Sequence, residues 1–214
     1  MRASRTIIDL THLLETGMPS YPGDGPPPQI LTRKLAQYAI SEIHLGAHYG
    51  THMDAPRHFL PNGKSIAGLN VECFTGPALR LRRDTVDAIA LNLNTKEVEL
   101  IQNLRPHWLV INTGFDRDWG RPEYFQAHPY LSIEFARQLI DLDIKGIGGD
   151  FPSMDAADGD KQNFPVHHRL LEHGILILEN LTNLQKLPEG LFTLVALPLK
   201  IDTDGAPARV VAYF

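Results

Sequence analysis

A continuous apolar run in the last quarter of the chain constrains the fold more than any other segment. Residues 174–178 read GILIL, and a charged residue, Glu179, follows at once. An uninterrupted aliphatic run of this length is typical of a strand that is buried on both faces. The run therefore predicts a strand in the interior of a sheet. A carboxylate at the end of such a strand needs a partner, and a cation would provide one.

Further strands are predicted wherever short runs are rich in aliphatic and β-branched residues. They are expected at 6–10, 39–47, 78–81, 108–112, 192–198 and 208–214. The first leads into MPSYPGDGPPP, a proline-rich and glycine-rich stretch that excludes regular structure. The strand at 39–47 is expected to continue into an irregular loop, because glycines interrupt its pattern.

Helices are predicted at three places. Ser132 is a candidate N-cap before IEFARQLIDLD, whose apolar residues follow helical spacing, and shorter helices are expected at 95–104 and 167–172. The aromatic and charged segment 116–129 is predicted to be a long loop of the kind that covers functional sites. Strands and helices together indicate one mixed α/β domain over residues 1–214, with the polar residues on loops.

Composition excludes several classes of protein. The formal net charge is −5 and no run of Lys or Arg occurs, so nucleic acid is not an expected partner. The single cysteine, Cys73, cannot form an internal disulfide, which favours a cytoplasmic location. Arg2 and Arg5 precede an apolar stretch that polar residues interrupt, so no signal peptide is expected. No window is apolar for long enough to cross a membrane.

One segment concentrates the residue types that bind metal ions. It reads HYGTHMDAPRH, and His48, His52 and Asp54 are its candidate ligands. Imidazole and carboxylate are the usual ligands of zinc, manganese and related ions, and a site with three protein ligands leaves a position open for water. Gly50 and Pro56 control the backbone between them, so the ligands are expected to converge from a turn.

The same residues also allow structural interpretations. Asp54 could cap a helix, and His48 could be a hydrogen-bonded loop histidine, but each of these explains one residue only. His44 lies in the predicted strand at 39–47 and is not expected to be a ligand. Asp54 has two carboxylate oxygens and could bridge two ions about 3.5–4 Å apart.

The string HYGTHMDAPRHF resembles the H-x-G-T-H-x-D-x-P-x-H-F signature of the cyclase-like metal-dependent hydrolases, the group that contains bacterial kynurenine formamidase and isatin hydrolase. The resemblance extends over nearly the whole chain, and its other landmarks are SYPGD, GPA, NTGF, HPYLS, GGDFPSMD and HHRLLEHGILILENL. It implies the swivelling β/β/α fold of that family, with mixed sheets and flanking helices in one domain. It also implies a homodimer or a homotetramer.

The resemblance also implies roles for single residues. In the family a first ion is held by the residues that match His48, His52 and Asp54, and the aspartate reaches a second ion. In members with two ions, that second ion takes a histidine and a glutamate that match His167 and Glu179, with His168 as the competing choice. One or two ions per chain are expected, Zn²⁺ first and Mn²⁺ as the alternative.

The expected reaction is hydrolysis of an amide bond in a small molecule. A divalent ion activates water near neutral pH and polarises the carbonyl group that the water attacks. His58 is the candidate for proton transfer, and the alternative is a histidine that orients Asp54. Tyr21 corresponds to an aromatic position that contacts substrate in formamidases, where tryptophan is common.

The leading substrate class is an aryl formamide such as N-formylkynurenine. The alternatives are opening of a cyclic amide or lactone, as in isatin hydrolase, and metal binding without catalysis. No G-x-S-x-G motif occurs, so a serine nucleophile is not expected.

Overall fold

The computed structural model describes residues 6–83 and 85–214, so Arg2 and Arg5 lie outside the described residues. Its three helices are α1 (Thr95–Leu104), α2 (Ile133–Asp141) and α3 (Pro165–Glu172). The strands of the described residues are β1 (Ile7–Asp9), β2 (Gln29–Lys34), β3 (Ala39–His44), β4 (His52–Asp54), β5 (Thr75–Arg82), β6 (Ala90–Leu91), β7 (Trp108–Asn112), β8 (Tyr130–Leu131), β9 (Gly146–Gly149), β10 (Leu176–Glu179), β11 (Leu191–Pro198) and β12 (Gly205–Tyr213).

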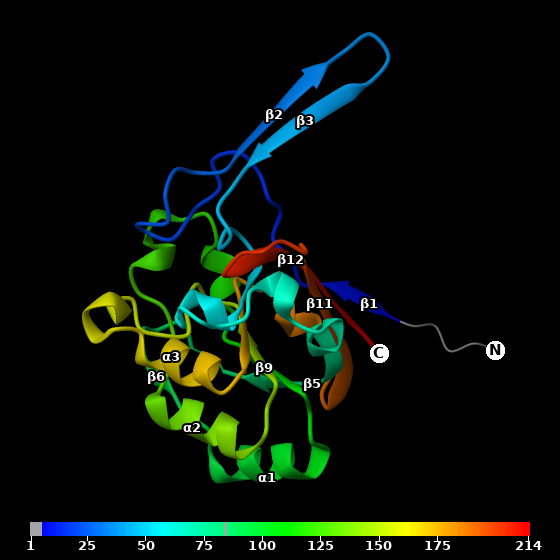
Figure 1. Ribbon diagram of the computed structural model, residues 1–214. Helices are drawn as coiled ribbons and strands as arrows, with labels where there is room; N and C mark the ends of the chain where they lie inside the picture. Colours follow the sequence, from blue (N-terminus) through cyan, green and yellow to red (C-terminus); the bar gives the residue numbers. More distant parts are fainter. Residues whose placement is uncertain (1–5, 84) are drawn as a thin grey trace, which may run out of the picture.

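The main sheet closes on itself. Figure 1 labels its strands β1, β5, β9, β11 and β12. Its order is β1-β12-β11-β5-β7-β9-β10-β4, and β4 pairs again with β12. The ring therefore runs from β12 through β4, while β1 lies outside it and pairs with the end of β12. Strands β5, β7, β9 and β10 are mutually parallel, and β4, β11 and β12 join them in antiparallel pairs. The expected α/β fold with a mixed sheet is confirmed.

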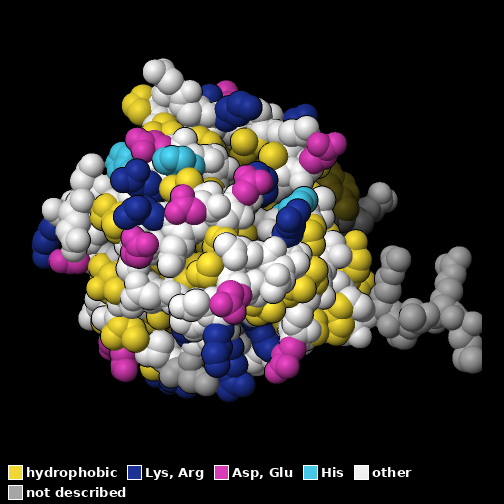
Figure 2. Space-filling view, turned by 90° about the horizontal axis from the view of Figure 1, so that it is seen from below, with side chains coloured by type: hydrophobic (Ala, Val, Ile, Leu, Met, Phe, Trp, Pro, Cys, Tyr) yellow, Lys and Arg dark blue, Asp and Glu magenta, His cyan; other side chains and the backbone are white. Residues whose placement is uncertain are grey.

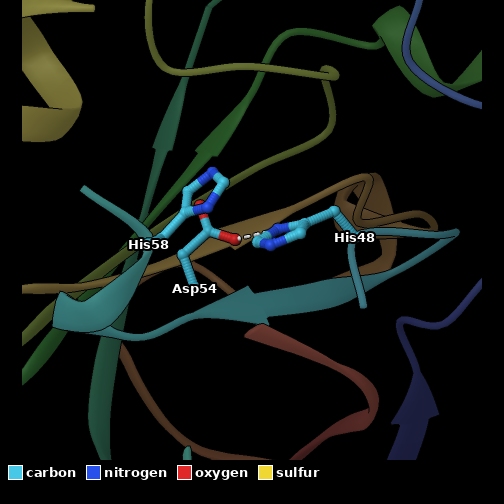
Figure 3. A group of neighbouring side chains, drawn as sticks. All are labelled: His48, Asp54 and His58. Atoms are coloured by element: carbon cyan, nitrogen blue, oxygen red, sulfur yellow. Dashed lines mark hydrogen bonds and ion pairs between the residues drawn. The ribbon is translucent and has the colours of Figure 1, made fainter. Parts of the chain in front are cut away.

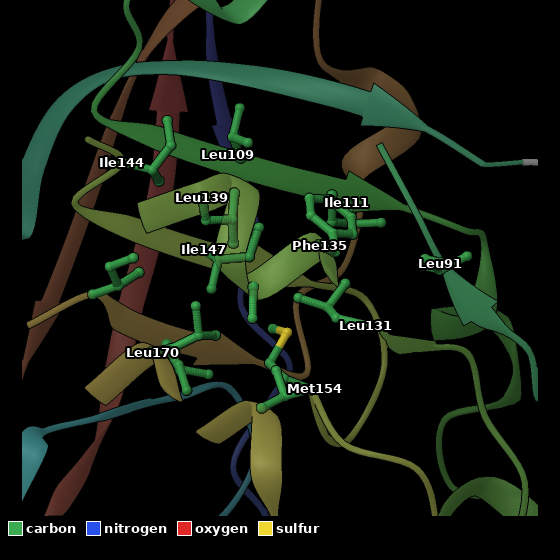
Figure 4. Packing of buried hydrophobic residues seen from close by; sticks show 14 of the residues in the cluster. Leu91, Leu109, Ile111, Leu131, Phe135, Leu139, Ile144, Ile147, Met154 and Leu170 are labelled. Atoms are coloured by element: carbon green, nitrogen blue, oxygen red, sulfur yellow. The ribbon is translucent and has the colours of Figure 1, made fainter. Parts of the chain in front are cut away.

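The central strands are buried on both faces, as the GILIL run predicts. Side chains along a strand point alternately to opposite faces. In β7, Leu109 and Ile111 belong to one hydrophobic cluster, and Trp108 and Val110 belong to the other. The first cluster packs between the sheet and all three helices, and Figure 4 shows the part of it beside α2 and α3. The second cluster fills the interior of the closed sheet.

Two of the helices, α1 and α2, begin where the sequence signals place them. Ser132 accepts a hydrogen bond from the backbone N–H of Phe135 at the start of α2, as predicted. Asn94 and Glu97 form a reciprocal capping box at the start of α1, which covers the predicted residues 95–104. α3 begins two residues before the expected position, at Pro165, where the missing N–H of proline costs nothing.

Several predicted boundaries are wrong. The strand expected at 174–178 begins at Leu176 and continues to Glu179, and the strand expected at 208–214 begins at Gly205. The strand at 39–47 ends at His44 and pairs with β2, which was not predicted, to form a hairpin that projects from the body of the molecule (Figure 1). The loop at 116–129 contains two short 3₁₀ turns.

The surface carries mixed charges. Figure 2 shows acidic and basic side chains interspersed with hydrophobic ones on the face seen from below. Within the described part of the chain, no helix is both long enough and apolar enough to pass through a lipid bilayer.

Candidate metal centre

The candidate site begins on β4, whose three residues point to two different sides of the sheet. Met53 is fully buried in the cluster inside the closed sheet, so His52 and Asp54 point outward from it. β4 pairs with β10 in a register that sets His52 opposite Glu179. The expectation that all ligands converge from a turn is wrong, because two of them lie on a strand. Alternate residues of a strand point to the same side, which explains why the side chains of His52 and Asp54 face the same way.

His48 lies in the turn that precedes β4. Gly50 has a φ of +64°, a left-handed conformation that favours glycine, and a Cβ at this position would displace the end of the Leu14 side chain. On the other side of β4, Ala55 is extended before Pro56, and Pro56 opens a short 3₁₀ turn that ends at His58. This turn brings the imidazole of His58 back over the site.

His167 comes from α3 and lies beside the same strands. Asp155 accepts hydrogen bonds from the backbone N–H groups of Val166 and His167, and from Nδ1 of the His167 ring at 2.6 Å. Because Nδ1 donates to this carboxylate, Nε2 faces the centre, 3.1 Å from Glu179 Oε1 and 3.6 Å from Asp54 Oδ2. His168 is half-buried against Phe59 and lies outside this contact.

Asp54 lies at the middle of the cluster. Its Oδ1 is 2.8 Å from His48 Nδ1 and 3.4 Å from His52 Nε2, and Figure 3 shows the first of these contacts. Its Oδ2 is buried and has no hydrogen-bond partner among the described residues. An ionised oxygen buried without a partner is costly, so this atom indicates a place for a cation.

Two groups of three residues have potential ligand atoms, one from each residue, that all lie within 4.8 Å of one another. Among the described residues these groups are His48, Asp54 and His58, and His52, Asp54 and Glu179. Asp54 belongs to both. The geometry therefore suits two neighbouring cation sites with a shared carboxylate. It also puts His58 within reach of an ion, so the position of His58 suits both metal ligation and proton transfer.

The titration of the cluster reflects its buried carboxylates. Burial opposes a charged imidazole, yet Asp54 and Asp204 outweigh it and raise the pKa of His48 to about 9. Burial acts likewise on His167, but its hydrogen bonds to Asp155 and Glu179 raise its pKa to about 10. Burial would raise the pKa of Asp54, but the neighbouring histidines hold it well below the usual range. The histidines of the metal-free cluster therefore bind extra protons, and a bound cation would displace these protons.

Asp204 joins the site from the loop between β11 and β12. Its Oδ2 lies 2.9 Å from His48 Nε2 and 3.0 Å from His58 Nδ1, so one carboxylate links both rings. The His48 and His58 rings stack with their centroids 4.0 Å apart. Burial is the main cause that lowers the pKa of His58, which keeps this imidazole neutral at pH 7.

The cluster opens into a cavity of about 240 Å³ with aromatic walls. Tyr21, the predicted substrate-contacting residue, lines it, and its ring meets Phe125 edge to face at a centroid distance of 5.8 Å. Trp119 and Phe125 come from the 116–129 segment, so that segment forms part of the cavity wall. The other aromatic walls are Phe59 and Phe164. His44, not expected to be a ligand, lies on the exposed hairpin beside Glu42.

The sequence interpretation missed two carboxylates of the site. Asp204 is 146 residues beyond His58, and its IDTDG surroundings resemble an ordinary turn. Asp155 lies in GGDFPSMD, a landmark to which no role was given. The only available signal for Asp155 was its position shortly before a helix that carries a candidate ligand.

A closed sheet that carries a buried imidazole and carboxylate cluster beside a cavity has the features of an enzyme active site with candidate metal ligands. Residues 8–156 match the family model Cyclase, described as "Putative cyclase". The kynurenine formamidase of Bacillus cereus is 33% identical over 209 residues, which cover 95% of each chain. The chain belongs to the cyclase family.

Solved structures agree on the fold. Isatin hydrolase A from Ralstonia solanacearum superposes with a TM-score of 0.85 at 23% identity, covering 98% of this chain and 92% of the other. A predicted metal-dependent hydrolase from Bacillus stearothermophilus superposes with a TM-score of 0.77 at 27% identity, covering 99% of both chains.

Proposed function

We propose that this protein is a metal-dependent amide hydrolase of the arylformamidase type, acting on N-formylkynurenine or a similar aryl formamide. The observation that carries the proposal is the buried His, Asp and Glu cluster at the floor of an aromatic cavity. The similarity to kynurenine formamidases over most of the chain supports the choice of bond. The products are formate and the free arylamine.

The ligands fit a divalent ion. Following the family pattern, His48, His52 and Asp54 would hold a first ion, and this set draws on both of the three-residue groups that share Asp54. Asp54, His167 and Glu179 would hold a second ion, which the unpartnered Asp54 Oδ2, 3.6 Å from His167 Nε2, supports. Imidazole and carboxylate ligands suit Zn²⁺ and Mn²⁺, with Zn²⁺ the first choice. When bound, such an ion polarises a carbonyl oxygen and lowers the pKa of water.

His58 moves the proton. Its Nδ1 is held by Asp204, so the neutral ring presents Nε2 to the cavity that it lines. There it accepts a proton from the attacking water as the new carbon–oxygen bond forms. The same proton then passes to the amide nitrogen as the carbon–nitrogen bond breaks, so the leaving group departs as a neutral amine. Asp204 orients the imidazole and stabilises its protonated form.

The aromatic walls position the substrate. Trp119, Phe125 and Tyr21 offer ring faces and edges to an aryl group, and ring contacts of this kind contribute about 0.5–1.5 kcal/mol each beyond buried area. The space is small for a polymer and suits a small molecule with one aromatic ring.

The test combines metal analysis of the purified protein with a substrate panel. The panel contains aryl formamides, isatin-like lactams and lactones. We expect bound zinc or manganese and preferential release of formate from the aryl formamides. Preferential ring opening would replace the proposal by an isatin hydrolase-like activity. A protein that binds metal but turns over none of the panel would contradict the proposed reaction class.

We further propose that the chain forms a homodimer or a homotetramer through the β2–β3 hairpin. An isolated two-stranded hairpin is only marginally stable in water. This one nevertheless exposes several large hydrophobic side chains: Leu31, Leu35, Tyr38, Ile40 and Ile43. Packing against a second copy would cover them.

A further inference from the structure

One backbone carbonyl beneath the site receives two hydrogen bonds. Gly50 O accepts one from Nδ1 of His52 at 2.9 Å, and a second from the Asn180 side-chain amide at 3.0 Å. A carbonyl oxygen can only accept, so Nδ1 of His52 carries the proton. Nε2 is then the nitrogen left to bind an ion, and it faces Asp54 and Glu179.

Asn180 follows Glu179 in sequence and is itself held on three sides. Its Oδ1 accepts a hydrogen bond from the hydroxyl of Tyr124 at 3.0 Å, and its backbone oxygen accepts one from Thr51 Oγ1 at 2.5 Å. Its φ is +56°, a left-handed conformation that asparagine tolerates better than most residues. Tyr124, Asn180 and Thr51 are all buried, so water does not compete for these bonds.

We infer that Asn180 is a positioning residue for the metal centre, and that Tyr124 of the 116–129 segment holds it in place. The inference rests on the proposed metal site. Asn180 anchors the Gly50 carbonyl, and this carbonyl fixes the tautomer and the orientation of the His52 ring. Partners of this kind orient a metal-binding histidine, and their loss typically costs about 10–100-fold in metal affinity. The 116–129 segment thus supports the ligands in addition to lining the cavity.

The sharpest variant is Asn180→Gly, because glycine adopts the left-handed conformation freely and only the side-chain amide is lost. Its matched control is Asn183→Gly. Asn183 also has a positive φ, of +60°, but its side chain donates to Asp9 O on the exposed surface. Zn²⁺ affinity is measured by chelator competition. We expect about a 10–100-fold weaker affinity for Asn180→Gly and less than a twofold change for Asn183→Gly.

A second readout needs no metal. In the metal-free protein, NMR measures how fast the Nδ1 proton of His52 exchanges with water. We expect slow exchange in the wild type and in Asn183→Gly, and faster exchange in Asn180→Gly, because the Gly50 carbonyl has lost its anchor. Wild-type Zn²⁺ affinity and an unchanged exchange rate in Asn180→Gly would overturn the inference. A wild type that binds no Zn²⁺ would overturn the metal site instead, and the exchange rate would still decide the role of Asn180.

The role of Tyr124 is tested by Tyr124→Phe, which keeps the ring and removes only the hydroxyl. A smaller loss of Zn²⁺ affinity, about threefold to tenfold, is expected because the bond from Asn180 to Gly50 remains. A variant with wild-type affinity would remove the 116–129 segment from the proposal.

Discussion

At the scale of single residues, the two oxygens of Asp54 face different partners. Oδ1 lies near His48 and His52, and Oδ2 lies 3.6 Å from His167 without a hydrogen-bond partner among the described residues. We predict that Asp54→Ala strips the protein of most bound metal, because two ions would lose their shared anion. Elemental analysis of the folded variant measures this. Full metal content would contradict the bridging role.

Glu179 reaches a different part of the cluster. Its Oε1 lies 3.1 Å from His167 Nε2 and accepts a hydrogen bond from the backbone N–H of Met154. Glu179→Gln keeps an acceptor for Met154 but removes the charge. The metal content is expected to fall from about two ions per chain towards one, since three ligands remain for the first ion. Loss of both ions together would show that the two sites cannot be separated.

His58 is predicted to act by proton transfer and not by ligation. His58→Gln is therefore expected to lower kcat by about 10²–10⁴ with unchanged metal content and a smaller change in KM. His168→Gln is the matched control, because His168 contacts the neighbouring Phe59 from outside the cluster. Parallel loss of metal and activity in His58→Gln would assign His58 as a ligand, which its group with His48 and Asp54 also permits.

At the scale of elements, the sequence could predict the helices and strands that local signals determine. It could not predict those that form only by pairing with a distant segment. The capped helix after Ser132 and the buried strand ending at Glu179 were predictable because propensity, capping and hydrophobicity agree within a few residues. β4 was not, because Met53 is one apolar residue between two polar ones. It is a strand only through pairing with β10 and β12, far away in sequence.

The 116–129 segment gives a pH dependence to stability. Its Trp119 stacks on His12 at a centroid distance of 4.2 Å, and burial is the main cause that lowers the pKa of His12 from 6.5 to about 4. Between these values the unfolded chain binds more protons than the folded one. The free energy of unfolding should therefore fall as the pH decreases from 6.5 to 4, by up to about 3 kcal/mol.

His12→Phe isolates this effect, because it keeps a ring against Trp119 and cannot titrate. The backbone bond from residue 12 to Thr51 is also retained. Urea denaturation at several pH values between 4 and 7 should give a flatter profile for the variant. Identical profiles for the variant and the wild type would assign the acid sensitivity to other groups.

At the scale of the whole molecule, the hairpin is the part that a single copy leaves uncovered. Ile43 is 59% exposed and Val71, away from the hairpin, is 62% exposed. Ile43→Glu is predicted to shift the protein towards monomer in light scattering, since a charge in an apolar interface is costly. Val71→Glu, the matched control, should leave the mass unchanged. A wild type that is already monomeric at micromolar concentration would refute the proposed assembly.

The closure of the sheet has a consequence for how the protein is made in the cell. β4 carries two of the candidate ligands, and its partners β10 and β12 leave the ribosome long after it does. The nascent chain therefore holds His52 and Asp54 on an unpaired segment for most of its synthesis. Pairing between segments so distant in sequence is slow, because the entropy of loop closure is lost before the contacts form. Under the proposed function, metal would therefore bind only after the last strand has arrived.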